Sequence, residues 1–178
     1  MKKTEIRISG LGGQGVVLAG QILGRAAVYD GKNAVQTQSY GAEARGSIAK
    51  SEVIIADDKI GFPMVRKCDI LVAMTQETAD KNIHDLKEDG TLLVDSYLVK
   101  NVPETRAKVY KIPITQTAEK TAGEKLYANM VMLGALAKAT GVVSEASLEK
   151  AIMEAVPKKA ADLNIKAYRM GRDIVSLP

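Results

Sequence analysis

Apolar and polar residues alternate along several short stretches of the chain, and between these stretches apolar residues recur at helical spacing. Alternation over four to eight residues is typical of a half-buried strand. An unbroken apolar run, such as residues 69–74, is typical of a parallel strand buried on both faces. The pattern predicts six strands, over residues 5–9, 33–38, 48–56, 69–74, 91–95 and 108–112.

Helices are predicted in most of the intervals between these strands. One spans residues 14–29 and stops at Asp30-Gly31, and a second begins after Thr75 as its N-cap and continues to residue 86. Asp89-Gly90 is expected to turn into the next strand. From Thr115 the chain is helical with breaks to its end, and it includes an almost wholly apolar segment (126–140) that ends at Gly141, a helix capped by Ser144, and a stop near Pro157.

This order predicts a three-layer α/β/α sandwich built on a mixed, mostly parallel sheet, with a Rossmann-like start. Strands 33–38 and 48–56 are joined only by a loop, residues 39–46, so we expect them to be antiparallel. Neither a repeat nor a linker interrupts the chain. We therefore expect one domain over residues 1–178.

The first strand leads into a glycine turn, Gly10-Leu-Gly-Gly-Gln-Gly15, which opens the first helix. Such a turn directs backbone N–H groups and the positive end of a helix dipole at whatever lies above it. Its spacing satisfies G-x-G-x-x-G, so a nucleotide-like, phosphate-bearing ligand is the first hypothesis. The candidate residues are Gly10, Gly12, Gly13, Gln14 and Gly15.

Two alternatives remain open for this turn. A free-standing NAD(P)-binding protein would carry an acidic residue at the tip of the second strand, but residues 36–39 contain none. A P-loop is excluded, because Gly-Lys-Ser/Thr does not follow the glycines. The turn could also serve packing alone, since Gly20 and Gly24 favour close approach of the helix to the sheet or to a partner subunit.

A second group of polar residues lies in the loop after the second strand, Thr37-Gln-Ser-Tyr-Gly-Ala-Glu-Ala-Arg-Gly46. Arg45 could donate two hydrogen bonds to a phosphate or carboxylate, or it could pair with Glu43. By strand order this loop emerges at the same sheet edge as the glycine turn, so Tyr40, Arg45 and Gly46 are further candidates. Asn129, a polar residue in an apolar helix, is interpreted as binding backbone and holding down a loop.

Composition limits the chemistry of the chain. It has 178 residues, a net charge of +4, one cysteine, one histidine and no tryptophan. One cysteine cannot hold an iron–sulfur cluster, which usually needs four thiolates. Cys68 is interpreted as a small buried residue and His84 as part of a polar surface. The sequence shows neither a nucleophile–base pair nor paired carboxylates, so we expect no catalytic residue.

The same sequence data limit the compartment in which the protein is expected and the kinds of partner it is expected to bind. The N-terminus lacks the apolar core of a signal peptide, and no apolar run is long enough to span a bilayer, so we expect a cytoplasmic protein. Scattered lysines and few aromatic residues argue against nucleic-acid binding.

Four segments together resemble the gamma subunit of 2-oxoacid:ferredoxin oxidoreductases, most closely those acting on 2-oxoglutarate. They are GLGGQGVVLAG (10–20), TQSYGAEARG (37–46), SEVII (51–55) and NMVMLG (129–134). The resemblance covers essentially the whole chain, in order. Where the family commonly has proline and a second glycine, this chain has Ala42 and Ser47, which leaves the loop conformation open.

The resemblance implies CoA-dependent oxidative decarboxylation of 2-oxoglutarate to succinyl-CoA, with electrons passed to ferredoxin. It also implies thiamine diphosphate, Mg²⁺ and iron–sulfur clusters on other subunits: thiamine-binding alpha and beta chains and a ferredoxin-like delta chain. The gamma subunit would shape the CoA side of the active site, where Arg45 is the expected anion contact. Pyruvate, branched-chain and indolepyruvate enzymes have similar gamma domains and remain alternatives.

Overall fold

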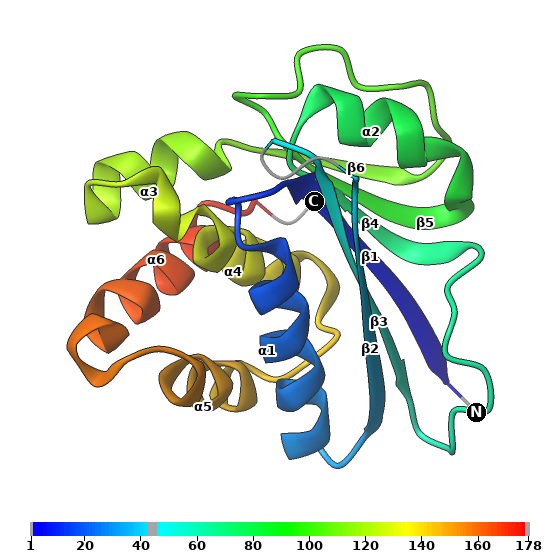
Figure 1. The fold of residues 1–178 in the computed structure, drawn as a ribbon, viewed down its shortest axis with the longest axis horizontal. Coiled ribbons are helices and arrows are strands. Elements are labelled where there is room, and N and C mark those ends of the chain that lie inside the picture. The colour runs from blue at the N-terminus through cyan, green and yellow to red at the C-terminus, as the bar shows by residue number, and fades with distance from the viewer. Residues whose placement is uncertain (1, 43–45, 177–178) are drawn as a thin grey trace.

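The computed structural model describes residues 2–42 and 46–176, which form a mixed six-stranded sheet with helices on both faces (Figure 1). The strands are β1 (Lys3–Leu11), β2 (Asn33–Tyr40), β3 (Ile48–Ala56), β4 (Cys68–Ala73), β5 (Leu86–Asp95) and β6 (Lys108–Ile112). The α-helices are α1 (Val16–Tyr29), α2 (Gln76–Asn82), α3 (Ile114–Ala122), α4 (Ala128–Thr140), α5 (Glu145–Ala155) and α6 (Ala161–Asp173). Three short 3₁₀ helices are η1 (Ile83–Asp85), η2 (Lys125–Tyr127) and η3 (Lys158–Ala160).

The sheet order is β2-β3-β1-β4-β5-β6. Strands β1, β4, β5 and β6 are parallel neighbours, whereas β3 is antiparallel to both β1 and β2. The predicted mixed, mostly parallel sheet and the predicted antiparallel pair are both confirmed. Because β3 lies between them, β1 and β2 run in the same direction, so both end at the same edge.

The two faces of the sheet are covered unequally. Helices α1 and α3–α6 lie on one face, while the short α2 lies on the other (Figure 1). Alternate residues of the inner strands supply a core on each side: Ile8 and Val72 pack toward α1 and α4, whereas Leu71 and Val94 pack toward α2. This is the period-two burial of a central strand, and it accounts for the unbroken apolar run of β4.

Helices α4 and α6 cross in close contact, and a glycine from each allows it. A Cβ atom built on Gly134 of α4 would collide with the carbonyl oxygen of Tyr168 in α6. A Cβ atom on Gly171 of α6 would collide in the same way with the carbonyl oxygen of Val131 in α4. Helix α4 is therefore buried on nearly every side, as its sequence predicts.

Several predicted caps are confirmed and two local predictions are wrong. Thr75 caps α2 with Thr78, Gly141 ends α4 with a φ of 61°, and Ser144 caps α5. The second helix, however, ends at residue 82 and gives way to η1. The predicted turn at Asp89-Gly90 is part of β5, where a Cβ on Gly90 would lie 2.7 Å from the Asp69 carbonyl oxygen. This glycine permits close backbone approach where the β4–β5 register shifts.

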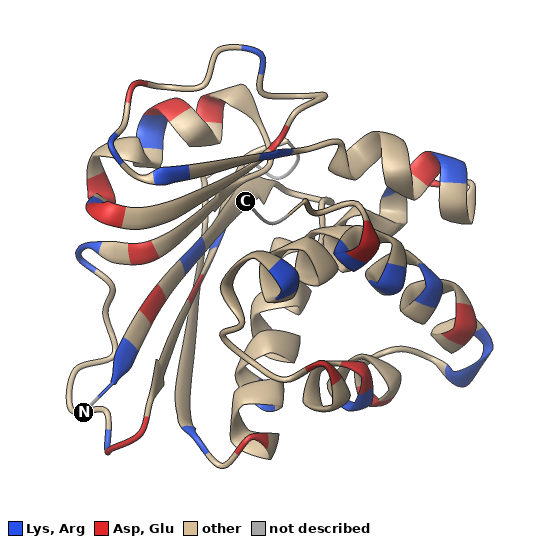
Figure 2. Ribbon diagram, turned by 180° about the vertical axis from the view of Figure 1, so that it is seen from behind, with Lys and Arg blue, Asp and Glu red and all other residues tan. Residues whose placement is uncertain are grey.

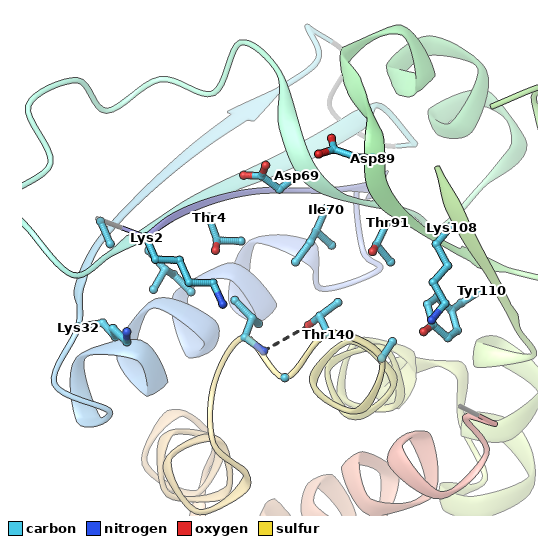
Figure 3. Close-up of a pocket in the computed structure, with 15 residues that line it drawn as sticks. Lys2, Thr4, Lys32, Asp69, Ile70, Asp89, Thr91, Lys108, Tyr110 and Thr140 are labelled. Atoms are coloured by element: carbon cyan, nitrogen blue, oxygen red, sulfur yellow. Dashed lines mark hydrogen bonds between the residues drawn. The ribbon is translucent and has the colours of Figure 1, made fainter. Parts of the chain in front are cut away.

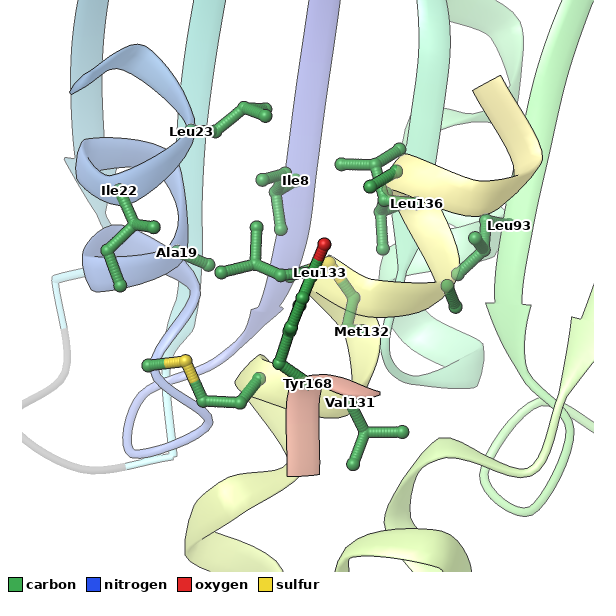
Figure 4. Packing of buried hydrophobic residues seen from close by; sticks show 14 of the residues in the cluster. Ile8, Ala19, Ile22, Leu23, Leu93, Val131, Met132, Leu133, Leu136 and Tyr168 are labelled. Atoms are coloured by element: carbon green, nitrogen blue, oxygen red, sulfur yellow. The ribbon is translucent and has the colours of Figure 1, made fainter. Parts of the chain in front are cut away.

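Tyr168 is completely buried, yet its hydroxyl has no hydrogen-bond partner among the described residues. Its ring lies among apolar side chains that include Ile8, Ala19 and Leu133 (Figure 4), and burial raises its pKa to about 12. A buried hydroxyl without a partner costs free energy. We therefore expect Tyr168→Phe to leave the free energy of unfolding unchanged or to raise it by about 1 kcal/mol, as measured by urea denaturation.

The matched control is Ser9→Ala. Ser9 is also completely buried, but its Oγ donates to the Val72 carbonyl oxygen at 3.0 Å. Removing that hydroxyl should lower the free energy of unfolding by about 1 kcal/mol. A Tyr168→Phe variant destabilised as much as Ser9→Ala would show that the phenol has a partner that stabilises the fold.

None of the helices in residues 2–42 and 46–176 has the length and apolar character needed to cross a bilayer.

Candidate functional site

The glycine turn connects the end of β1 to the start of α1. Gly13 and Gly15 have φ values of 94° and 72°, in the left-handed region that favours glycine. Gln14 stabilises the turn from within, because its Oε1 accepts a hydrogen bond from the Leu11 N–H at 2.7 Å. Its backbone N–H also donates to the Leu11 carbonyl oxygen at 3.1 Å. Both the side-chain oxygen and the backbone N–H of Gln14 therefore stabilise the turn.

The first turn of α1 presents backbone amides without competing negative charge. Gly15 occupies the N-cap, no described side chain caps the helix, and its first turn holds no acidic residue. The N–H groups of the first helical turn have no partner within an α-helix, and the helix dipole adds partial positive charge there. This end of α1 can accept an anion.

Asn129, at the start of α4, holds the glycine turn from behind. Its Nδ2 donates to the Gly15 carbonyl oxygen at 3.3 Å, which confirms the interpretation that Asn129 binds backbone and ties down a loop. A Cβ on Gly15 would lie only 2.5 Å from the same nitrogen. A glycine at position 15 is thus required both by its φ and by Asn129.

The two predicted loops lie side by side. Ala49 of β3 pairs with Gly10 of β1 on one side and with Tyr40 of β2 on the other. The backbone N–H of Gly12 donates to the Ser47 carbonyl oxygen at 2.8 Å, so the glycine turn is bonded directly to the second loop. Two strand spacings separate Tyr40 from Gly10, roughly 10 Å.

A pocket of about 250 Å³ opens between these loops. Tyr40 stands at this pocket with 62% of its surface exposed. The pocket is lined by Leu11, Gly12, Gly13, Gly15, Val16, Val17, Tyr40 and Ala49. Four of the predicted residues, Gly12, Gly13, Gly15 and Tyr40, therefore surround one hollow. We call this surface the glycine edge.

The other predicted residues have different places. Gly10 lies behind the turn, where a Cβ would meet Gln14 Oε1 at 2.6 Å. Gly46 has a φ of 70°, and no described non-glycine residue has a positive φ, so Ser47 adopts an ordinary conformation. Arg45 and Glu43 lie outside the described residues.

The glycines inside α1 have unequal roles. A Cβ on Gly20 would collide with the Ser51 hydroxyl of β3, so Gly20 serves close packing on the sheet. A Cβ on Gly24 would find only Gln36 Cβ, at 3.9 Å, which is an ordinary contact. Close approach to the sheet, rather than to a partner subunit, therefore accounts for the glycine at position 20. Position 24 has room for a larger side chain.

Cys68 and His84 take the places expected of them. Cys68 is completely buried at the start of β4, and burial raises its pKa to about 11, so its thiol stays protonated and unreactive at neutral pH. His84 is exposed in η1. Among the described residues, no three His, Cys, Asp or Glu side chains are grouped so that they could hold a metal ion.

A buried arginine on the opposite face was missed by the sequence reasoning. Arg7 of β1 is 4% exposed, and its guanidinium bonds to Glu52 Oε1, Asp85 Oδ2 and the Val65 carbonyl oxygen at 2.7, 2.5 and 3.1 Å. Arg7 thereby links β1 to β3, to η1 and to the segment before β4. The sequence holds only one signal for this role, the position of Arg7 in its strand. Arg7 alternates with Ile6 and Ile8, so it lies on the other face of a strand that is buried on both faces.

A larger pocket, about 570 Å³, lies at the other ends of the parallel strands, between the sheet and the end of α4 (Figure 3). Lys2, Lys32 and Lys108 stand around it, and Thr4, Thr91 and Thr140 contribute hydroxyls. Lys32 is already paired with Asp57. None of the predicted binding residues lines this pocket, so it is separate from the glycine edge.

Comparison with known proteins gives a consistent result. The family model "Pyruvate ferredoxin/flavodoxin oxidoreductase" matches residues 5–174. A 2-oxoglutarate synthase subunit KorC from Methanocaldococcus jannaschii is 51% identical over 175 residues, which cover 97% of this chain and 94% of that protein.

Two solved structures have the same fold. The gamma subunit of a keto/oxoacid ferredoxin oxidoreductase from Geobacter sulfurreducens is 50% identical, with a TM-score of 0.86 over 96% of both chains. A 2-oxoglutarate:ferredoxin oxidoreductase from Magnetococcus marinus, with 2-oxoglutarate, coenzyme A and succinyl-CoA bound, is 25% identical with a TM-score of 0.87. The match covers 98% of this chain but 31% of that one, so the same fold also occurs within a longer polypeptide.

Proposed function

This chain belongs to the pyruvate ferredoxin/flavodoxin oxidoreductase family, and we propose that it is the gamma subunit of a 2-oxoglutarate:ferredoxin oxidoreductase. The assembly would convert 2-oxoglutarate and CoA to succinyl-CoA and carbon dioxide and pass the electrons to ferredoxin. The observation that carries this proposal is 51% identity, over nearly the whole chain, to a 2-oxoglutarate synthase subunit. Membership of this family also argues against a free-standing NAD(P)-binding protein.

The chain does not perform this chemistry by itself in our proposal. With one cysteine and one histidine it lacks the ligands of an iron–sulfur cluster. Thiamine diphosphate, Mg²⁺ and iron–sulfur clusters, which supply decarboxylation and electron transfer, are assigned to alpha, beta and delta subunits. The occurrence of this fold as about a third of a longer relative supports a role beside other domains. Residues 1–178 would form one gamma-type domain that functions in the cytoplasm.

We assign the CoA side of the active site to the glycine edge. The amides at the start of α1 suit a phosphate oxygen of CoA, because they combine unpaired donors with the positive end of the helix dipole. Gly12 and Gly13 leave room for a ligand to approach the backbone, and Tyr40 offers an exposed ring beside them. Gly10, Gln14 and Gly15 preserve the shape of the turn, whereas Arg45 and Gly46 complete the second loop.

The test is Gly12→Leu in the assembled enzyme. Gly12 does not have a left-handed φ, and a Cβ there would lie 3.6 Å from the Ser47 carbonyl oxygen, an ordinary contact. The leucine should therefore be tolerated by the fold while it occupies the approach to the turn. We expect the KM for CoA to rise about tenfold, which corresponds to about 1.4 kcal/mol of lost binding, with the KM for 2-oxoglutarate nearly unchanged.

The matched control is His84→Leu, which adds the same side chain at an exposed position directly before β5, at the opposite ends of the parallel strands. It should leave both KM values unchanged. If Gly12→Leu assembles normally and binds CoA as well as the natural sequence does, the glycine edge serves packing and the assignment of CoA to it is wrong.

A further inference from the structure

We propose that a second surface of this chain, at the sheet edge opposite the glycine edge, docks an acidic neighbouring subunit through Phe62 and Met64. The surface comprises these two side chains and the cations around them, and we call it the Phe62 surface. The inference rests on the proposed function, because it assumes that the chain works in an assembly. The Phe62 surface shares no residue with the glycine edge.

The segment between β3 and β4 exposes two large apolar side chains next to each other. Phe62 is the only phenylalanine in the chain, and it and Met64 are 53% and 60% exposed. Pro63 lies between them and limits the freedom of the backbone. Phe62 lines two pockets, of about 440 and 170 Å³. Neighbouring apolar side chains left in water at one place mark an interaction site more often than single ones do.

The chain holds this segment in position at both ends. Val65, next to Met64, is buried, and its carbonyl oxygen accepts a hydrogen bond from the buried Arg7 at 3.1 Å. At the other end, the Asp57 N–H donates to the Lys2 carbonyl oxygen at 3.2 Å, and Ile60 packs against the core under α2. Phe62 and Met64 are thus presented by an anchored segment, which lowers the entropy cost of binding.

Charge around the Phe62 surface identifies the partner's chemistry. The guanidinium of Arg66 lies 5.4 Å from the centre of the Phe62 ring. Figure 2 shows Lys and Arg positions at the start of β1 and along the segment that leads into β4. The cations that line the two pockets are Lys2, Lys3, Lys59, Arg66, Lys67 and Lys87, against the acidic residues Glu5 and Asp58.

Glu5 is already paired with Lys3 and Lys87 at 3.3 and 3.4 Å, and Lys87 also pairs with Asp69 at 2.7 Å. Lys59 and Arg66 form no ion pair among the described residues. The apolar pair is therefore bordered by unmatched positive charge. A partner that presents an apolar depression with an acidic border would complement both features. The apolar contact would supply affinity, and the charge contact would set the orientation.

The experiment compares the natural complex with one that carries Phe62→Asp and Met64→Asp, co-expressed with its partner subunits and analysed by native mass spectrometry. We expect the double variant to lose one subunit, with its dissociation constant raised tenfold or more. The charge variant Lys59→Glu with Arg66→Glu should weaken the same contact and reduce its dependence on salt. The matched control is Val28→Asp with Met153→Asp, at positions 55% and 58% exposed, and it should assemble normally.

The outcomes are distinct. A natural-sequence chain that captures no partner would refute the proposed function. Normal assembly of both natural and double-variant chains would refute the Phe62 surface alone. Self-association of the isolated chain that the double variant abolishes would assign the surface to a second copy of this chain, and so would overturn the acidic partner.

Discussion

Replacing Gly134 by alanine is expected to lower the free energy of unfolding by about 3 kcal/mol or more, which places it among the severe single substitutions. The added methyl group would collide with the carbonyl oxygen of Tyr168 on the facing helix. That oxygen belongs to a helix backbone, so no side-chain rotation can relieve the collision. Helices α4 and α6 would have to separate, which exposes the apolar face around Leu133 and Tyr168.

Gly24→Ala is the matched control, because it makes the same chemical change inside another helix. Here the methyl group would find only Gln36 Cβ, at 3.9 Å. Since alanine is a better helix former than glycine, this variant should be stabilised by up to about 1 kcal/mol. Guanidinium denaturation of both variants measures the contrast. Equal changes in the free energy of unfolding for the two variants would show that the close crossing of α4 and α6 does not depend on Gly134.

The fold and much of the glycine edge could be predicted from local patterns. The alternation in β1 and β3, the apolar run of β4 and the caps at Thr75, Gly141 and Ser144 are signals contained in a few adjacent residues. The shared sheet edge of Gly12 and Tyr40 followed from strand order alone. The role of Asn129 could be predicted for a similar reason, because a single side-chain amide in an apolar helix must have a hydrogen-bond partner nearby.

What the sequence could not indicate is which distant residue meets which. A glycine in a helix looks the same whether its neighbour is close, as at Gly134, or far, as at Gly24. Asp89-Gly90 predicts a turn because Asp-Gly is typical of turns, but Gly90 lies within β5, where the Asp69 backbone approaches it closely. The partners of Arg7 come from β3, η1 and the segment before β4, which no short pattern connects.

Gln14 illustrates a different limit. Its place in the glycine motif made it a candidate for ligand binding, but its Oε1 is engaged by the Leu11 N–H. A polar residue within a tight turn can serve the turn or the ligand, and only geometry distinguishes the two. The same geometry leaves Gly12, Gly13 and Tyr40 exposed at the pocket.

The second large effect concerns activity. If this chain supplies the CoA side of the active site and no redox centre, then neither it nor its partners alone should turn over 2-oxoglutarate. The purified chain should be inactive. Partner subunits prepared without it should lose at least about 99% of the CoA-dependent rate, a deficit of roughly 3 kcal/mol in the activation free energy. Adding the chain back should restore the rate in proportion to the assembled complex.

The most direct measurement is therefore reduction of ferredoxin, followed by its absorbance, for the chain alone, the partner subunits alone and the two combined. Each sample is assayed with CoA and either 2-oxoglutarate or pyruvate. The account predicts reduction only in the combined sample, and faster with 2-oxoglutarate than with pyruvate. Ferredoxin reduction by the isolated chain, or an undiminished rate in its absence, would contradict it.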